Sequence, residues 1–176
     1  MKWLWILLGA LVVLVAIVHV TGLCVAREHR ATCRARFLQP AEALFTALTD
    51  VEGLAAWRTG LQSAVRIDPI GGKPAYREST SHGTCTYVVE TQDAPRTLVL
   101  RIADDTLPYG GTWTFVLTPE AGATALAITE DGVVKPAIFR ALARFVFGYH
   151  ATMEQYLKAL GRKFGADVRV ERVPAD

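Results

Sequence analysis

The sequence has few of the residues that usually carry catalytic or metal chemistry. Its 176 residues include only 3 cysteines and 4 histidines, and the cysteines form neither a CxxC pair nor any other spacing typical of a metal site. A nucleophile elbow, a glycine-rich phosphate loop and an HExxH motif are also missing. We therefore expect no cofactor and no metal, and the motifs alone do not predict an enzyme.

The sequence also has no large excess of positive or negative charge. The chain has 19 lysines and arginines against 17 aspartates and glutamates, which gives a net charge of +2. No basic stripe with interleaved aromatic residues occurs, although such a stripe is typical of nucleic-acid binding. We expect no nucleic-acid partner, and the sequence identifies no protein partner.

What the sequence does contain is an uncharged apolar run from Trp3 to Leu23. A helix rises about 1.5 Å per residue, so about twenty residues cross the roughly 30 Å hydrocarbon layer of a membrane. The alternative is a secretory signal, but the run is longer than its usual 7 to 15 apolar residues, and Cys24-Val25-Ala26 fits a cleavage site poorly. We predict an uncleaved transmembrane anchor over residues 1–26.

Positive charges on the two sides of this run predict its orientation. Lys2 stands alone before it, whereas Arg27, Arg30, Arg34 and Arg36 follow it. Because cytoplasmic flanks are enriched in lysine and arginine, the rest of the chain should face the cytoplasm. Alternatively, Arg34 and Arg36 belong to a first strand and contribute nothing to the orientation, which leaves Arg27 and Arg30 against Lys2.

The cysteines agree with a reducing compartment. Cys24, Cys33 and Cys85 are odd in number, and each is interpreted as a small apolar residue with a free thiol. A disulfide between Cys33 and Cys85 remains the alternative, and it would contradict the cytoplasmic location.

After the anchor, residues 27–165 have the length of one domain, and residues 166–176 form a charged tail. Alternating apolar residues predict a first strand over Ala31–Phe37, and Pro40 and Asp50 begin two short helices, Ala41–Leu48 and a second reaching Trp57. Six further strands are separated by short turns, which indicates an antiparallel meander. The predicted strands are Ala64–Ile70, Pro74–Thr80, Thr84–Thr91, Arg96–Ala103, Gly111–Leu117 and Thr124–Glu130.

One face of this sheet is apolar, because Trp113, Phe115 and Leu117 share a side opposite Thr112 and Thr114. The segment Pro136–Phe164 predicts one long amphipathic helix lying across that face. Its apolar sector contains Ile138, Leu142, Phe145, Val146, Tyr149, Met153, Tyr156, Leu157, Leu160 and Phe164.

This order of elements resembles the START/Bet v 1-like (SRPBCC) superfamily, in particular its bacterial polyketide cyclase/dehydrase and lipid transport family. The residues that carry the resemblance are Phe45 with Leu48-Thr49-Asp50 and Trp57, the segment Gly111–Phe115, the stretch Thr129–Gly132, and the helix ending at Tyr156–Leu160. The resemblance covers residues 31–165. It implies an α+β helix-grip fold, in which a curved sheet of about seven strands is gripped by a long C-terminal helix.

In such folds a cavity lies between the sheet and the long helix. The resemblance therefore implies a ligand site for a hydrophobic small molecule or lipid. Its expected lining is Phe37, Ile67, Tyr87, Val89, Leu100, Ile102, Trp113, Phe115, Leu126, Ile128, Tyr149 and Met153. The alternative is that the same side chains fill a closed core.

Three residues are weak candidates for proton transfer in that cavity. Glu130 continues the apolar side of the last predicted strand, where burial would raise the pKa of its carboxyl. The alternative is that Glu130 or Asp131 only helps to cap the long helix or lies at the rim of the cavity. Tyr87 equally fits packing within a strand, and His150 a half-exposed structural position.

Phe147 is an anomaly, because it lies among Arg140, Arg144 and Lys158 in the charged sector of the long helix. An aromatic residue among cations could rest on anionic lipid headgroups, although a single exposed aromatic residue is also ordinary.

Three functions follow from these patterns. The first is binding or transport of a hydrophobic small molecule or lipid by a domain anchored in a bacterial inner membrane and facing the cytoplasm. The second is an aromatase/cyclase-like enzyme acting on a hydrophobic substrate. The third is a protein-interaction module with a vestigial cavity.

Overall fold

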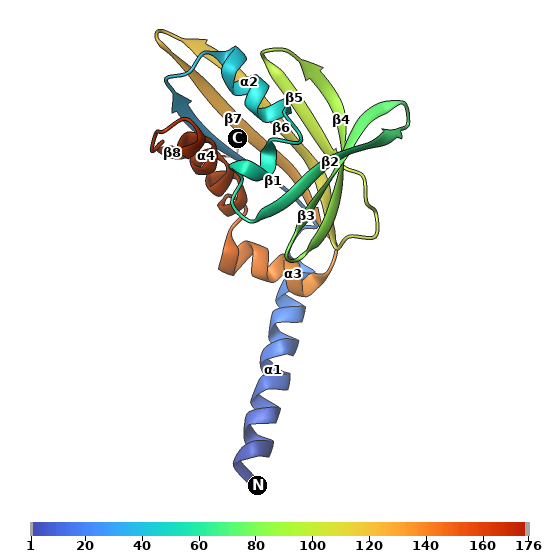
Figure 1. Ribbon diagram of the computed structural model, residues 1–176. Helices are drawn as coiled ribbons and strands as arrows, with labels where there is room; N and C mark the ends of the chain where they lie inside the picture. Colours follow the sequence, from blue (N-terminus) through green and yellow to red (C-terminus); the bar gives the residue numbers. More distant parts are fainter. Residues whose placement is uncertain (1, 175–176) are drawn as a thin grey trace.

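Helices and strands follow one another largely as the sequence predicts, as a computed structural model describing residues 2–174 shows (Figure 1). One curved antiparallel sheet forms the body of the domain, and α1 projects away from it. The helices are α1 Lys2–Cys24, α2 Ala41–Thr49, the 3-10 turn η1 Leu54–Ala56, α3 Ala137–Leu142, the π-helical turn η2 Ala143–Phe147 and α4 Ala151–Lys163. The strands are β1 Glu28–Phe37, β2 Leu61–Ile70, β3 Lys73–Thr80, β4 Gly83–Asp93, β5 Thr97–Ile102, β6 Tyr109–Glu120, β7 Ala123–Val134 and β8 Val170–Val173. This is the predicted α+β helix-grip fold.

The sheet has eight strands in the order β2-β3-β4-β5-β6-β7-β1-β8. All predicted strands are present, and β2 to β7 form the expected meander. The first strand pairs with β7 rather than β2, so that Trp113, Glu130 and Ala31 lie side by side across β6, β7 and β1. The tail, whose structure the sequence did not predict, adds β8 at the edge beside β1.

The core lies between the concave face of the sheet and the helices. Phe115, Leu126 and Ile128 are fully buried, and they pack in one cluster with Met153 and Leu157 of α4. The predicted assignment of the apolar face is thus confirmed for β6 and β7. Full burial of a large apolar side chain stabilises the folded state by about 1.5–3 kcal/mol relative to exposure. The contacts among these side chains therefore hold α4 against the sheet.

The prediction of one unbroken helix over Pro136–Phe164 was wrong. The segment forms α3, the π-helical turn η2 and α4, and Gly148 separates η2 from α4 with φ 72° and ψ 155°, a conformation that favours glycine. The part from Tyr149 onward packs against the core face of the sheet, whereas α3 packs mainly against α1 and meets the sheet at β7. Phe145 and Val146, expected on the buried side, are 66% and 65% exposed.

The second short helix predicted from Asp50 to Trp57 is only the 3-10 turn η1. Asp50 is the C-cap of α2 and not the N-cap of η1, which is Gly53 and has no side-chain cap; the Asp50 carboxylate does accept a hydrogen bond from the backbone N–H of Gly53 at 3.3 Å. A full helix is prevented by the immediate return of the chain into β2 after Gly60, which has φ 84°.

Strand β7 continues beyond its predicted end at Glu130 as far as Val134. Glu130 therefore lies within the sheet rather than at the start of a helix, and α3 begins after Pro136 without a side-chain cap. Asp131 instead pairs with Arg30 at 3.2 Å. Capping of the C-terminal helix by Glu130 or Asp131 is thus excluded.

All three cysteines have free thiols. Cys33 lies on β1 and Cys85 on β4, and three strands separate these two in the sheet. At about 4.8 Å per strand spacing the two strands are roughly 19 Å apart, whereas a disulfide needs Cα atoms within about 7 Å. The alternative of a Cys33–Cys85 disulfide is excluded.

Helix α1 is long and apolar enough to cross a membrane, and only 6% of its most apolar window is buried, unlike the core helix of a soluble protein. Its one buried residue is Gly22, which packs against α3: a Cβ at Gly22 would lie 1.8 Å from the carbonyl oxygen of Ala137. Arg140 of α3 donates from Nη1 to the carbonyl of Val25 at 3.2 Å, just beyond the end of α1. The two helices therefore meet in a close backbone contact (Figure 1).

Candidate functional site

The concave face is only partly covered, because α4 has 13 residues and packs at the β1 and β8 end of the sheet. The expected lining residues divide accordingly. Those under the helices are buried: Phe37, Leu100, Phe115, Leu126, Ile128 and Met153. Five others are part-exposed: Tyr87, Val89, Ile102, Trp113 and Tyr149. The prediction for Ile67 was wrong, because Ile67 pairs with Ala75, which pairs with Val88, and these residues lie on the opposite face of the sheet from Tyr76 and Tyr87. The part-exposed side chains of β4 to β6 define an aromatic and aliphatic half of the concave face that α4 leaves open.

A buried ion pair lies within this face. Arg58 follows η1 and donates from Nη1 to the carboxylate of Glu78 on β3. The Glu78 residue is 3% exposed, and the Arg58 side chain is 20% exposed. Burial raises the pKa of the Glu78 carboxyl, and the positive charge of Arg58 opposes that rise. A charge pair removed from water costs folding free energy, so its presence here is a feature that packing alone does not explain.

Three tyrosines surround the pair. Tyr76 on β3 stacks on Tyr87 of β4 with ring centroids 5.3 Å apart, and the Arg58 guanidinium lies 4.9 Å from the centroid of the Tyr156 ring on α4. Burial, above all, raises the pKa of all three phenols. They therefore stay protonated at neutral pH, so that each phenol has a proton it can donate to a ligand. We call Arg58, Glu78, Tyr76, Tyr87 and Tyr156 the Arg58 cluster.

Aromatic rings join the Arg58 cluster to the rest of the concave face. Trp57, Trp113 and Phe115 each meet the Tyr156 ring edge-on or tilted, at centroid distances of 5.3, 5.9 and 5.5 Å. A hollow of about 70 Å³ beside Arg58 and Tyr156 opens between the η1 turn and α4. That volume holds a water molecule or two, so a larger ligand requires α4 or the η1 turn to move.

A second polar group lies at the end of the concave face nearest α1. The imidazole of His29 on β1 stacks on the Tyr149 ring at 3.9 Å, and its Nε2 lies 3.6 Å from a carboxylate oxygen of Glu130. Gly132 lies under the imidazole, where a Cβ would come within 2.4 Å of Nε2. Glycine at this position is therefore what lets His29 turn inward.

The largest hollow described adjoins this group and has a volume of about 600 Å³. It lies between the end of α1, strand β1, the η2 turn and the C-terminal segment. Its side chains include Arg144, Phe145, Tyr149 and His150 together with His29. The hollow thus combines aromatic surface with cationic groups at the end of the domain where α1 leaves it.

A protein-family model described as activator of Hsp90 ATPase homolog 1-like protein (AHSA1) matches residues 39–164. The chain belongs to the AHSA1 family. The match covers most of the domain, from the start of α2 to the end of α4, and thus contains the Arg58 cluster. A comparison with curated protein sequences finds no significant match.

Solved structures share the fold of this AHSA1 chain. A conserved protein from Geobacillus kaustophilus has a TM-score of 0.65 at 15% identity, over 81% of this chain and 99% of that one. A START superfamily protein from Mycobacterium smegmatis has 0.61 at 18% identity, over 77% and 96%. The Zhui aromatase/cyclase from Streptomyces sp. R1128 has 0.59 at 13% identity, over 76% and 91%.

The suspected START/SRPBCC superfamily is thereby confirmed. At these identities the neighbours show the fold alone. A fold that aromatase/cyclases also use is consistent with binding of a hydrophobic small molecule.

The three proton-transfer candidates of this AHSA1 domain do not converge on one point. Tyr87 belongs to the Arg58 cluster on β4, whereas Glu130 lies beside His29 on β7, three strands further along the sheet. His150 lines the 600 Å³ hollow at the start of α4, where burial lowers the pKa of its imidazole. Among the residues that the structure describes, no three histidine, cysteine or acidic side chains are placed to hold a metal ion.

Sequence reasoning missed Arg58, Glu78 and His29. The signal for Glu78 was its position two residues after Tyr76, on the same side of β3, which marks an acidic residue on an apolar face. His29 had the same kind of signal, because it shares the side of Cys33 and Ala31 on β1. Arg58 follows a turn and has no periodic pattern, so only the fold reveals its contact with Glu78.

Proposed function

We propose that this chain is a membrane-anchored domain that binds or carries a hydrophobic small molecule or lipid in its concave face. The observation that carries the proposal is the Arg58 cluster within the part-exposed aromatic half of that face. Ligand sites are typically apolar surfaces with a few convergent polar groups that orient the ligand. The protonated phenols and the Arg58 guanidinium offer hydrogen bonds to the polar end of such a ligand, while Trp113 and Ile102 offer apolar contact.

The anchor supports the same proposal. Helix α1 is apolar and exposed along its length, and its two flanks differ in positive charge, with Lys2 before it and Arg27 and Arg30 after it. By the positive-inside rule the domain faces the cytoplasm. Since apolar ligands partition into the bilayer, a tethered cavity meets them at a high local concentration.

The test is native mass spectrometry of the full chain extracted in detergent, with lipid extract from the host membrane as the probe. Ile102→Glu places a charge on the open half of the concave face, and Val116→Glu places the same charge on the outward side of β6. Lipids that only surround α1 bind both variants equally, so the Val116 variant is the matched control. We expect lipid occupancy to fall in Ile102→Glu alone. Equal occupancy in both variants and the parent would overturn the proposal.

A second function, acid-base catalysis on a hydrophobic substrate, is favoured by one observation. His29 and Glu130 form an imidazole–carboxylate pair at 3.6 Å beside the 600 Å³ hollow, and such a pair can transfer a proton. Turnover of an aromatic polyketide-type substrate that is abolished by His29→Gln and by Glu130→Gln would support it. Binding without turnover in the parent chain would leave the first function alone.

A further inference from the structure

The segment formed by α3 and η2, Ala137–Phe147, exposes an unusual amount of large apolar surface. Phe139 is 49% exposed, and Phe145, Val146 and Phe147 are 66%, 65% and 67% exposed. Single exposed apolar residues are normal, but four within nine consecutive positions form a patch. The expectation that Phe147 would stand alone among charges was thus too narrow.

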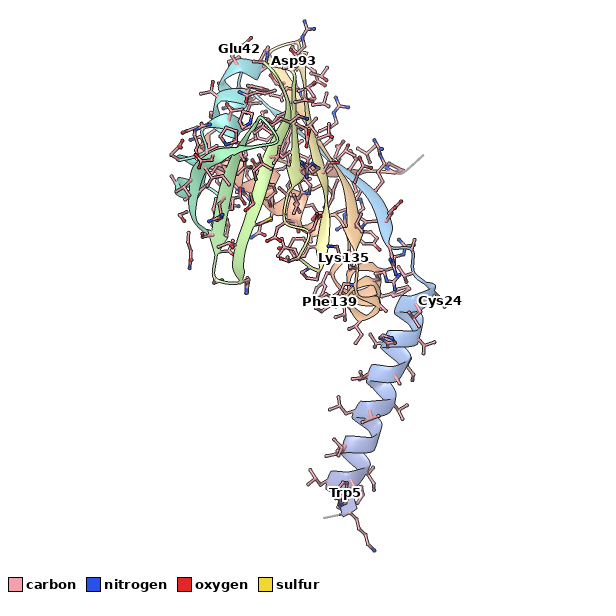
Figure 2. The ribbon with its side chains drawn as sticks, turned by 90° about the vertical axis from the view of Figure 1, so that its right-hand side faces the viewer. Trp5, Cys24, Glu42, Asp93, Lys135 and Phe139 are labelled. Atoms are coloured by element: carbon pink, nitrogen blue, oxygen red, sulfur yellow. The ribbon has the colours of Figure 1, made fainter. Side chains whose placement is uncertain are left out.

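The opposite side of the segment faces the protein. Ala137, Arg140 and Ala141 are buried, and the contacts of Gly22 with Ala137 and of Arg140 with Val25 hold α3 against the end of α1. In Figure 1 α3 lies across the end of α1, and in Figure 2 Phe139 lies at the α1 end of the domain, whereas Glu42 and Asp93 lie at the opposite end. The apolar patch therefore lies where the chain leaves α1.

The length of α1 places this contact at the height of a membrane surface. The apolar run ends at Leu23, and Gly22 is the residue in contact with α3. At about 1.5 Å per residue, Gly22 lies within a few ångströms of the hydrocarbon boundary if the run spans the membrane. An apolar segment held at that height meets the headgroup and upper acyl region, which is where the apolar faces of interfacial helices bury.

Positive charges close to the segment suit the same surface. Lys135 precedes α3, Arg144 lies within η2, and Arg27 follows α1. Cytoplasmic leaflets carry anionic lipids, which attract basic residues held near the membrane surface. A protein partner would also accept aromatic residues, but it would not account for their position at the end of a spanning helix.

We propose that Ala137–Phe147 is an interfacial docking segment, which inserts Phe139, Phe145, Val146 and Phe147 into the leaflet that α1 enters. The proposal rests on α1 being a membrane anchor, as in the proposed function. Docking gives the domain one orientation on the bilayer. It also brings the 600 Å³ hollow, which Phe145 and Arg144 line, to the lipid surface.

The test uses the full chain in vesicles of phosphatidylcholine with phosphatidylglycerol, carrying an environment-sensitive fluorophore at a single cysteine. Cys24→Ser and Cys85→Ser leave the buried Cys33, and Phe147→Cys provides the labelling site. Asp93→Cys in the same background is the matched control at the far end of the domain. We expect a blue-shifted emission at position 147, quenched by lipids spin-labelled near the headgroup, and neither effect at position 93.

The failures are distinguishable by alkaline carbonate extraction of the same vesicles. If the chain stays in the membrane and the probe at position 147 behaves like the probe at position 93, the docking segment is wrong while the anchor stands. If carbonate releases the chain, the anchor itself fails, and the docking proposal and the membrane part of the proposed function fail with it. The double variant Phe139→Ser, Phe145→Ser removes two of the side chains proposed to insert. If the probe at position 147 is quenched as strongly in that variant as without the two changes, the proposed insertion is also overturned.

Discussion

The guanidinium of Arg58 donates a hydrogen bond to the carboxylate of Glu78 inside the concave face, 20 residues along the chain. Removal of one partner of a buried ion pair leaves an uncompensated charge, which costs about 3–5 kcal/mol of folding free energy. We expect Glu78→Leu to lose an amount near the lower end of that range, because the part-exposed Arg58 can turn toward water. Urea denaturation of the full chain in detergent, followed by near-ultraviolet circular dichroism, measures the loss.

The matched control removes both charges. In Arg58→Met with Glu78→Leu no charge stays buried, and replacement of such pairs by apolar residues is often neutral. We expect the double variant to recover most of the stability that Glu78→Leu loses. A double variant that is less stable than Glu78→Leu alone would show that the pair stabilises the fold in its own right.

The fold could be predicted because its signals are local. Alternation along β6, with Trp113 and Phe115 inward and Thr114 outward, is visible in the sequence because a strand has a period of two. Turn residues between strands then predict the meander. The pairing of β1 with β7 and of β8 with β1 has no local signal, since it depends on how the whole sheet curves.

The candidate site was harder to predict for a physical reason. Arg58 and Glu78 meet only because η1 and β3 are adjacent in the fold. The side of β3 that Glu78 shares with Tyr76 indicates an inward carboxylate, but no sequence pattern identifies Arg58 as its partner. The helix break at Gly148 had a visible signal, a glycine within the apolar pattern, but the amphipathic period on both sides outweighed it. That error hid the docking segment, because Phe145 and Val146 were assigned to the core.

The close approach of Gly132 to His29 predicts that a methyl group is not tolerated there. A Cβ at Gly132 would lie 2.3 Å from Cε1 of the imidazole, which is closer than any real contact. We expect Gly132→Ala to destabilise the domain by about 1–3 kcal/mol through overpacking. The thermal unfolding midpoint of the full chain in detergent measures it.

His29→Ala should relieve this clash, so we expect Gly132→Ala to cost little in that background. The two changes are then non-additive, as expected for residues in direct contact. Additive effects would mean that the imidazole does not lie over Gly132.

Acid should weaken the domain through His150. Burial lowers the pKa of its imidazole below the usual 6.5, and the charge of Arg172 lowers it further, while Glu154 and Glu130 oppose the shift. Because the folded state favours the neutral imidazole, the stability that His150 contributes is complete above pH 6.5 and declines as the pH falls from there through its folded pKa.

Thermal unfolding of the full chain between pH 7.5 and pH 5, on the order of one measurement per half unit, tests this prediction. We expect a shallower decline in His150→Gln than in the parent chain. His82→Gln in the exposed turn between β3 and β4 is the control and should leave the decline unchanged. If His150→Gln and His82→Gln behave alike, the His150 imidazole is not the group that responds to acid.

Cys33 and Cys24 should react with a thiol reagent at very different rates. Burial, first of all, raises the pKa of the Cys33 thiol to about 11, and the side chain is fully buried on β1, whereas Cys24 is exposed at the end of α1. With that pKa about one thiol in a thousand is ionised at pH 8, and thiolates are the reactive species. We expect maleimide to modify Cys24 rapidly and Cys33 only when the domain unfolds, as followed by mass spectrometry with Cys24→Ser as the control. Rapid modification of Cys33 in the folded chain would mean that the inner side of β1 is not packed against α4, and the covered half of the concave face would then be open as well.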